Sequence, residues 1–166
     1  MKNMNFTRSI DKYDPESGFY FKSISQEKES SRFSKNNEIV TTNIGVLDPL
    51  TNKITTIFPT NSNLNIGEFI FETSYCDKSS TIQFNHNSSY IRNNNHIQKR
   101  DLNNHVLIST ITEEIHTLWV ADKKGTNVKE ITKFSDKSDW HLDVKNMSIR
   151  VVSSEEGALV IDSFDW

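Results

Sequence analysis

The sequence contains one cysteine, 5 glycines and 3 prolines among its 166 residues. Cys76 has no second cysteine to pair with, which excludes an intramolecular disulfide and a cysteine-based metal cluster within one chain. The chain offers no phosphate-binding Gly-rich loop, and it lacks the G-x-S-x-G and H-E-x-x-H motifs. The common signatures of nucleotide, serine-hydrolase and zinc-protease chemistry are therefore missing, and we expect no cofactor and no catalytic residue.

Long apolar runs are missing as well. No stretch of about 18 consecutive apolar residues is available to cross a membrane as a helix. Residues 1–8 lack the apolar core of a secretory signal. Together with the lone cysteine, these features predict a cytoplasmic protein in a reducing compartment, with no membrane partner.

Alanine is nearly absent, which bears directly on fold class. The chain has 2 alanines against 17 isoleucines, 9 valines and 14 threonines. Alanine is the best helix former, whereas β-branched residues lose rotamer freedom in helices and fit pleated surfaces. Composition therefore predicts an all-β, mainly antiparallel protein in which strand exceeds helix by at least about three to one.

Apolar and β-branched runs separated by turn residues indicate where the strands lie. The charged, serine-rich segment 26–37 predicts a mobile loop within a single β domain over residues 1–166. The predicted strands cover 19–24, 38–48, 53–58, 68–75, 81–85, 105–111, 116–122, 128–132, 140–144, 148–152 and 158–162, with a weaker one at 89–92.

Two of these hairpins repeat each other at a constant offset of 74 residues. Ile44–Asp48 followed by Ile54 and Ile57 matches Leu118–Asp122 followed by Val128 and Ile131. Half of that offset reaches Ile82 to Asn85, a poor middle copy with polar residues at apolar positions. The match predicts equivalent antiparallel pairs over 43–58 and 117–132. A unit of about 37–40 residues, which is about half of the offset, is typical of repeated β units.

Residues 118–132 resemble the blade repeat of TolB-like β-propellers. An apolar strand ends in Asp122, a turn containing Gly125 follows, and a second strand ends in Ile131-Thr132. Residues 44–58 look like a divergent copy. The resemblance implies propeller-blade-like hairpins and a scaffold for protein contacts. Because 166 residues hold four blades at most, a partial propeller, a curved open sheet and a β-sandwich remain alternatives.

Charge and histidine spacing narrow the possible partners. The net charge is −3 and the only basic run is 96–100, so generic nucleic-acid binding is disfavoured. We predict no metal site, because the histidines have no known ligand spacing, although two of them, His105 and His116, could face each other across a hairpin. The five histidines are His86, His96, His105, His116 and His141. Cys76 is expected to be a small buried hydrophobe.

These observations favour a small protein-binding module, most concretely a bacterial immunity protein that neutralises a partner toxin with a basic domain. An acidic surface would steer such a partner. The alternative is an enzyme or a small-ligand-binding β protein without a recognisable motif. The candidate contact residues are acidic turn residues and two tryptophans: Glu113, Glu114, Asp136, Asp139, Glu155, Glu156, Trp140 and Trp166. Trp166 is expected to dock back on the domain rather than to stay exposed.

Overall fold

A computed structural model describes residues 12–28, 38–85 and 101–166 of the chain. Over these residues it contains 13 strands and no helix. All strand pairings are antiparallel. The predicted all-β, antiparallel class is confirmed for this part of the chain, and the weak strand expected at 89–92 lies outside the described residues.

The first sheet is a meander of four strands in chain order. It contains β1 (Lys12–Tyr13), β2 (Tyr20–Lys28), β3 (Glu38–Asp48) and β4 (Lys53–Thr56). Strand β2 continues through Lys28, where it pairs with Glu38, so the loop predicted from residue 26 is wrong for 26–28. The cross-strand ladder to β3 outweighs the polar character of these residues. The rest of that predicted loop, 29–37, lies outside the described residues.

The second sheet has the order β10-β9-β8-β5. Its strands are β5 (Ile66–Ile70), β8 (His105–Thr112), β9 (Ile115–Asp122) and β10 (Lys129–Ser135). Between β5 and β8 the chain forms a separate hairpin of β6 (Glu72–Cys76) and β7 (Thr81–Phe84). The middle copy of the repeat falls on β7, which belongs to this hairpin and is not a third equivalent unit.

The strand expected over 68–75 is divided in two at Phe71. The side chain of Asn85 accepts a hydrogen bond from the Phe71 backbone N–H at 3.0 Å and donates one to the Phe69 carbonyl at 2.8 Å. The amide side chain thus takes the place of a neighbouring strand where the ladder is interrupted. One continuous apolar run can therefore serve two sheets.

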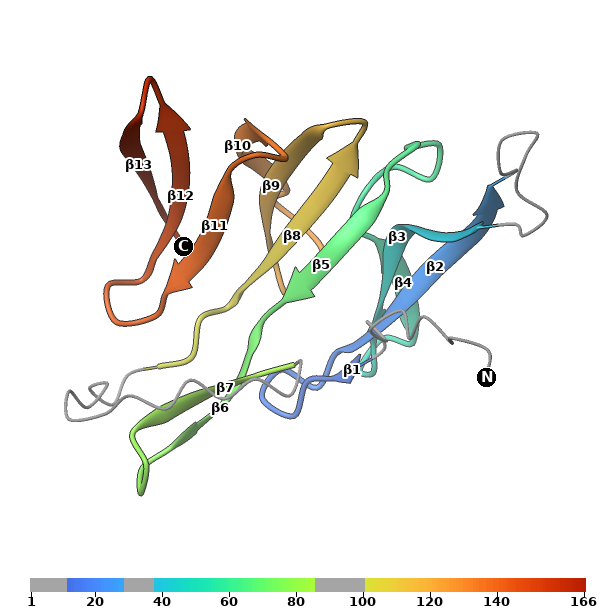
Figure 1. Cartoon of the computed structure of the whole chain (residues 1–166). Helices are drawn as coiled ribbons and strands as arrows, with labels where there is room; N and C mark the ends of the chain where they lie inside the picture. The colour runs from blue at the N-terminus through green and yellow to red at the C-terminus, as the bar shows by residue number, and fades with distance from the viewer. Residues whose placement is uncertain (1–11, 29–37, 86–100) are drawn as a thin grey trace, which may run out of the picture.

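The last sheet is formed by β11 (Asp139–Asp143), β12 (Ser148–Glu155) and β13 (Ala158–Asp165). Figure 1 shows the three sheets side by side, with the second sheet between the first and the last. The C-terminal Trp166 is 7% exposed and its backbone N–H donates to the Met147 carbonyl. The predicted docking of the C-terminus is therefore confirmed.

Two hydrophobic cores lie between the three sheets. The first core lies between the first and second sheets and includes Phe21, Ile44, Val46, Phe69 and Ile108. The second core lies between the second and last sheets and includes Ile70, Leu107, Leu118, Ile149 and Val151. The second sheet is therefore apolar on both faces. The first and last sheets each turn one face away from these cores, which we call their outer faces.

The repeat predicted from sequence has the same hydrogen-bonded register in both copies. Val46 pairs with Thr55 in the first hairpin, and Val120 pairs with Lys129 in the second, which is the same pair 74 residues later. Strand alternation places Val46 and Val120 on corresponding faces, each turned toward the next sheet along the chain. The predicted equivalence of the two hairpins is confirmed.

Gly125 has φ +79°, as the turn between β9 and β10 predicts. Its position is also crowded. A Cβ built on Gly125 would lie 3.0 Å from Val46 Cγ2 and 3.5 Å from Ile57 Cγ1. The turn of the second sheet therefore packs directly on the first sheet, and glycine is needed there for both the backbone angle and the close approach.

Candidate functional site

Three hairpin turns gather at one end of the strands and carry most of the predicted contact residues. They are the β8–β9 turn, the β10–β11 turn and the β12–β13 turn, which lie at the top of Figure 1. The Asp136 backbone N–H donates to the Glu114 carbonyl at 2.9 Å, which joins two of these turns. We call this surface the acidic end; its carboxylates are Glu113, Glu114, Asp136, Asp139, Glu155 and Glu156.

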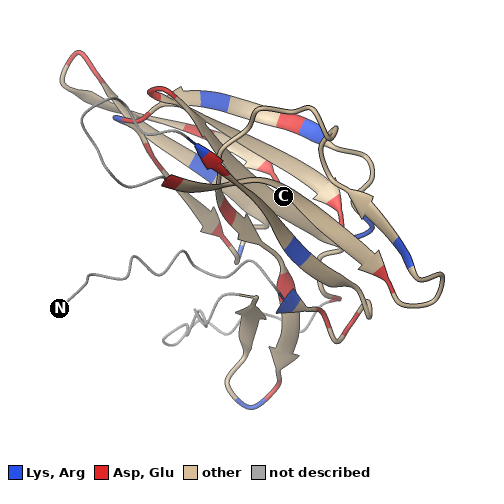
Figure 2. Cartoon of the chain, turned by 90° about the vertical axis from the view of Figure 1, so that its right-hand side faces the viewer, with Lys and Arg blue, Asp and Glu red and all other residues tan. Residues whose placement is uncertain are grey.

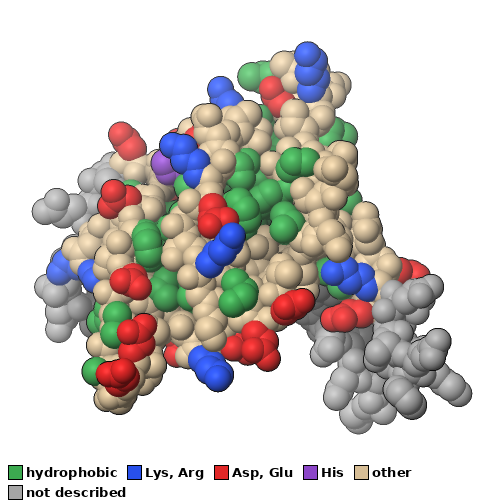
Figure 3. Space-filling model, turned by 90° about the horizontal axis from the view of Figure 1, so that it is seen from above, with side chains coloured by type: hydrophobic (Ala, Val, Ile, Leu, Met, Phe, Trp, Pro, Cys, Tyr) green, Lys and Arg blue, Asp and Glu red, His purple; other side chains and the backbone are tan. Residues whose placement is uncertain are grey.

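All six carboxylate residues of the acidic end are exposed. Glu113 and Glu156 have positive φ values of 55° and 48°, as befits tight turns between paired strands. Within the described residues no ion pair joins any of the six to a lysine or arginine. Seen from above, Figure 3 shows carboxylates gathered on the left, the side of the last sheet.

The two tryptophans of the predicted contact set lie in the second core. Trp166 is buried, and Trp140 is half-buried against the same cluster. Both side chains point inward between the second and last sheets, so neither indole is presented to a partner as a surface contact. The candidate contact surface is therefore reduced to the acidic turns.

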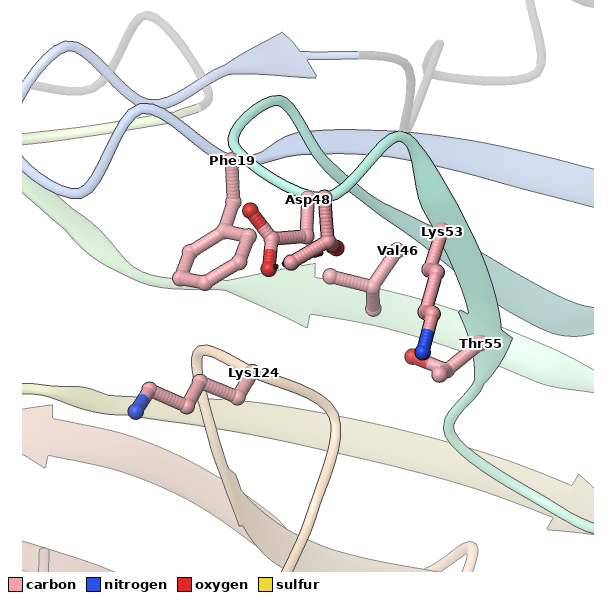
Figure 4. Close-up of a pocket in the computed structure, with 7 residues that line it drawn as sticks. Phe19, Val46, Asp48, Lys53, Thr55 and Lys124 are labelled. Atoms are coloured by element: carbon pink, nitrogen blue, oxygen red, sulfur yellow. Dashed lines mark hydrogen bonds between the residues drawn. The ribbon is translucent and has the colours of Figure 1, made fainter.

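A pocket of about 260 Å³ opens between the β3–β4 hairpin and the β9–β10 turn (Figure 4). Val46 and the ring of Phe19 supply apolar walls. Lys53 and Lys124 also line the pocket, and in Figure 4 the Lys124 ammonium points away from Lys53. Thr51, Thr55 and Asp48 complete the lining. The phenyl ring and the valine suit an apolar group, and Lys53 and the threonine hydroxyls add polar atoms to the lining. Sequence reasoning did not predict this pocket, because it lies between two hairpins that are distant in sequence.

Asp48 in this pocket is already engaged by its own turn. Its carboxylate accepts the Leu50 backbone N–H at 2.9 Å and the Thr51 hydroxyl at 3.0 Å. The bond from Leu50 is the main reason that the pKa of Asp48 lies below 3.8. Asp48 therefore stays ionised at neutral pH and is not suited to act as a proton donor.

A buried ion pair holds the other end of the molecule together. The Lys123 ammonium lies 2.9 Å from the Asp14 carboxylate, with the two side chains 2% and 0% exposed. It also donates to the Glu72 carbonyl at 2.8 Å and lies 5.4 Å from the ring centre of Phe71. The pair is closed to solvent and to substrate, so its role is structural: it ties together the β1–β2 loop, the β5–β6 junction and the β9–β10 turn.

The three described histidines and the cysteine lie on four different strands: His105 on β8, His116 on β9, His141 on β11 and Cys76 on β6. His105 pairs with Asp122 and His116 pairs with Ile111, so the expectation that they face each other is wrong. The two-residue turn of Glu113 and Glu114 pairs Thr112 with Ile115, and this register places His105 opposite Asp122 instead of opposite His116. Within the described residues no cluster of three metal-ligating side chains occurs. Cys76 is half-buried, and hydrogen bonding from Ser79 lowers the pKa of its thiol below 9.0.

Comparison with known proteins adds no relative. No protein-family model, no curated protein and no solved structure matches this chain. Among the described residues, no helix is long and apolar enough to cross a membrane. The geometry of the chain itself is therefore the basis for any functional conclusion.

Proposed function

We propose that this chain is a protein-binding module whose acidic end contacts a basic surface of another protein. The observation that carries the proposal is the gathering of acidic turns from two neighbouring sheets at one end of the strands. Tight turns on a rigid sheet scaffold present side chains to a partner with little loss of conformational entropy. Exposed like charges also speed association with an oppositely charged partner.

The partner class that fits best is a basic toxin domain that the module neutralises in a bacterial cell. A nuclease toxin carries a basic face for its substrate, and an acidic protein surface of similar extent can cover that face. Such a function needs surface complementarity and no chemistry of its own. The resemblance of residues 118–132 to the blade repeat of TolB-like propellers also supports a role in protein contacts, because that family mostly provides scaffolds for such contacts.

A charge-reversal experiment tests the proposal. The test variant replaces Glu114, Glu155 and Glu156 by lysine, and the tagged protein is used to capture partners from the source cell. The control variant replaces three exposed carboxylates at the other end of the strands, Glu16, Asp77 and Asp101, and so has the same net charge.

We expect the test variant to lose the captured partner and the control variant to keep it. With the purified partner, the association rate should fall by at least about tenfold in the test variant, and its decrease with added salt should become shallower. Equal association rates for the two variants would show that the acidic end is not the interface. Turnover of a substrate by the purified protein would contradict the proposed function altogether.

A further inference from the structure

Strand β13 ends the last sheet and has no strand on its outer side within the described residues. It pairs with β12 along its whole length and lies at the far left of Figure 1. With 8 residues it is the longest of the strands that end a described sheet. Such a strand exposes a row of backbone N–H and C=O groups that can pair with another strand.

Every second residue of β13 directs its backbone groups to this free edge. The Trp166 N–H donates to the Met147 carbonyl, so the even-numbered residues of the strand point toward β12. The direction alternates along an antiparallel ladder, which leaves the N–H and C=O groups of the odd-numbered residues at the free edge. These residues are Leu159, Ile161, Ser163 and Asp165, and all four are exposed.

The next-longest end strand, β10, is protected against edge-to-edge pairing, whereas β13 is not. Strand β10 carries Lys129 and Lys133, and its register with β9 shifts at a bulge. Lysines and bulges on edge strands hinder pairing with another chain. Strand β13 has no lysine and no proline, and its register with β12 runs without a break from Ala158 to Asp165. Its free edge is therefore suited to accept a strand.

The sequence of β13 is complementary to itself when two copies run antiparallel. One register places Ile161 opposite Ile161 of the second copy and Leu159 opposite Ser163, and it aligns residues 158–164 of both copies. Three hydrogen-bonded residue pairs then exchange about six backbone bonds. On the outer face, Val152 and Ile161 of one copy continue into Ile161 and Val152 of the other, so four aliphatic side chains form one row across the contact.

Charge and length favour this register over its two neighbours. Asp162 lies opposite Val160 of the second copy, and Asp165 lies beyond the last paired residue. Moving the two-fold axis one residue toward the C-terminus would place Asp162 opposite Asp162, and like charges directly opposite each other are unfavourable. Moving it one residue toward the N-terminus would leave only residues 158–162 to pair, because the β12–β13 turn precedes them.

We propose that two copies of this chain pair β13 with β13 across a two-fold axis at Ile161. The two last sheets then form one continuous sheet, and the contact uses the same surface on both copies, so it closes at a dimer. Register, charge and the aliphatic row all fit β13 to itself, which identifies the occupant of the free edge as a second copy. The contact covers part of Leu159 and Ile161, which are 75% and 57% exposed in one copy.

A proline at the free edge tests the proposal by sedimentation equilibrium of the full chain. The wild type should dimerise reversibly. Ser163→Pro removes an N–H that points to the free edge and leaves the ladder to β12 intact, so dimerisation should weaken at least about tenfold. Ser163→Val is the matched control: it also lacks the hydroxyl that Arg150 contacts at 3.2 Å, but it keeps the N–H and should dimerise like the wild type. Equal far-UV circular dichroism spectra confirm that both variants are folded.

Cysteine cross-linking tests the register, with Cys76→Ser as the background. Ile161→Cys places two thiols opposite each other, with Cα atoms about 5.5 Å apart, which is within the range of a disulfide. Leu159→Cys is the control, because its two copies would lie more than about 13 Å apart along the paired strands. Mild oxidation should therefore cross-link the Ile161→Cys protein and leave the Leu159→Cys protein uncross-linked.

Three results would each overturn the proposal: a wild type that stays monomeric at every concentration, equal association of the two Ser163 variants, or cross-linking through Leu159→Cys in preference to Ile161→Cys. The variants keep every carboxylate of the acidic end. Capture of a basic partner by that surface is measured separately, so the two proposals can fail independently.

Discussion

The two repeated hairpins have one register but different surroundings, and their equivalent positions show what determines each residue. Gly45 and Trp119 occupy the same position 74 residues apart. Gly45 lies on the outer face of the first sheet. Trp119 faces the first core, where its Nε1 donates to the Thr110 hydroxyl at 2.9 Å and its ring meets Phe58 at 5.4 Å. The pairing register of the two hairpins is the same because their turns have the same length. The size of the side chain at an equivalent position differs because different groups pack on that face.

The turns of the two hairpins differ even more. Pro49 begins the turn in the first hairpin and is exposed, whereas the equivalent residue in the second hairpin is the buried Lys123. A proline makes the first turn by fixing its own backbone. The second turn is held by an ion pair to a distant loop. The second hairpin should therefore be the more sensitive of the two to a single substitution.

Replacing Lys123 by Met should cause the largest loss of stability. The substitution leaves the Asp14 carboxylate buried without its cation, and breaking a buried pair in this way costs about 3–5 kcal/mol of the free energy of unfolding. Urea denaturation measures the change.

The neighbouring residue supplies the control for this comparison. Lys124 is exposed, so Lys124→Met should change stability by no more than about 0.5 kcal/mol. The double variant Asp14→Asn with Lys123→Met should recover part of the loss, because no uncompensated charge remains buried. Equal stability of the Lys123→Met and Lys124→Met proteins would show that the ion pair does not hold the second turn.

Two glycine substitutions separate backbone strain from the contact between sheets. Gly125 and Gly157 have nearly the same φ, +79° and +81°, but a Cβ on Gly157 meets nothing within 4 Å. Gly157→Val should therefore cost only the left-handed strain, about 1–2 kcal/mol. Gly125→Val should cost about 1–3 kcal/mol more, because the new side chain collides with Val46. Thermal and urea unfolding of both variants measure the difference, and equal losses would contradict the close packing of this turn.

The same comparison shows how far the sequence determined the fold. β-Branched runs located most strands, and the 74-residue match predicted both the register of the two hairpins and the positive φ of Gly125. The break at Phe71 was missed, since an apolar run reads as one strand when the amide that interrupts it, Asn85, comes from a later segment. Periodicity within a segment carries no information about such long-range hydrogen bonds.

The candidate site was predictable residue by residue but not as a surface. Turn composition identified Glu113, Glu114, Glu155 and Glu156 as exposed acids, and the structure places them at one end because the strands that precede them run in the same direction. In Figure 2, by contrast, acidic and basic positions are interspersed along the strands. Lys123 was missed because a lysine beside a turn glycine ordinarily points into solvent, and its partner Asp14 is remote in sequence.

The hairpin of β11 and β12 can be compared with the two repeated hairpins. In all three, an aspartate ends the first strand. Asp48 and Asp122 each accept hydrogen bonds from their own turn. Asp143 does the same at the end of β11, where the Asn146 side chain donates to it at 2.8 Å. Arg150 donates to the same carboxylate at 3.0 Å. Asp122 has a weaker basic partner, since His105 Nε2 lies 3.7 Å from its carboxylate and is charged only when protonated. The Asp143 turn should therefore be the most sensitive to acid.

The bond from Asn146, followed by that from Arg150, lowers the pKa of Asp143 from 3.8 to about 2. The folded pKa lies below the unfolded one, so Asp143 contributes stability above pH 3.8 and loses that contribution as the pH falls to about 2. The stability difference between wild type and Asp143→Asn should be constant above about pH 5 and shrink below it. NMR titration of the side-chain carboxyl should place its midpoint near 2, and Asn146→Ala should raise that midpoint more than Arg150→Gln does, because the Asn146 bond is the larger cause. A midpoint that stays low in the Asn146→Ala protein would assign the effect to Arg150 and remove the turn bond as its source.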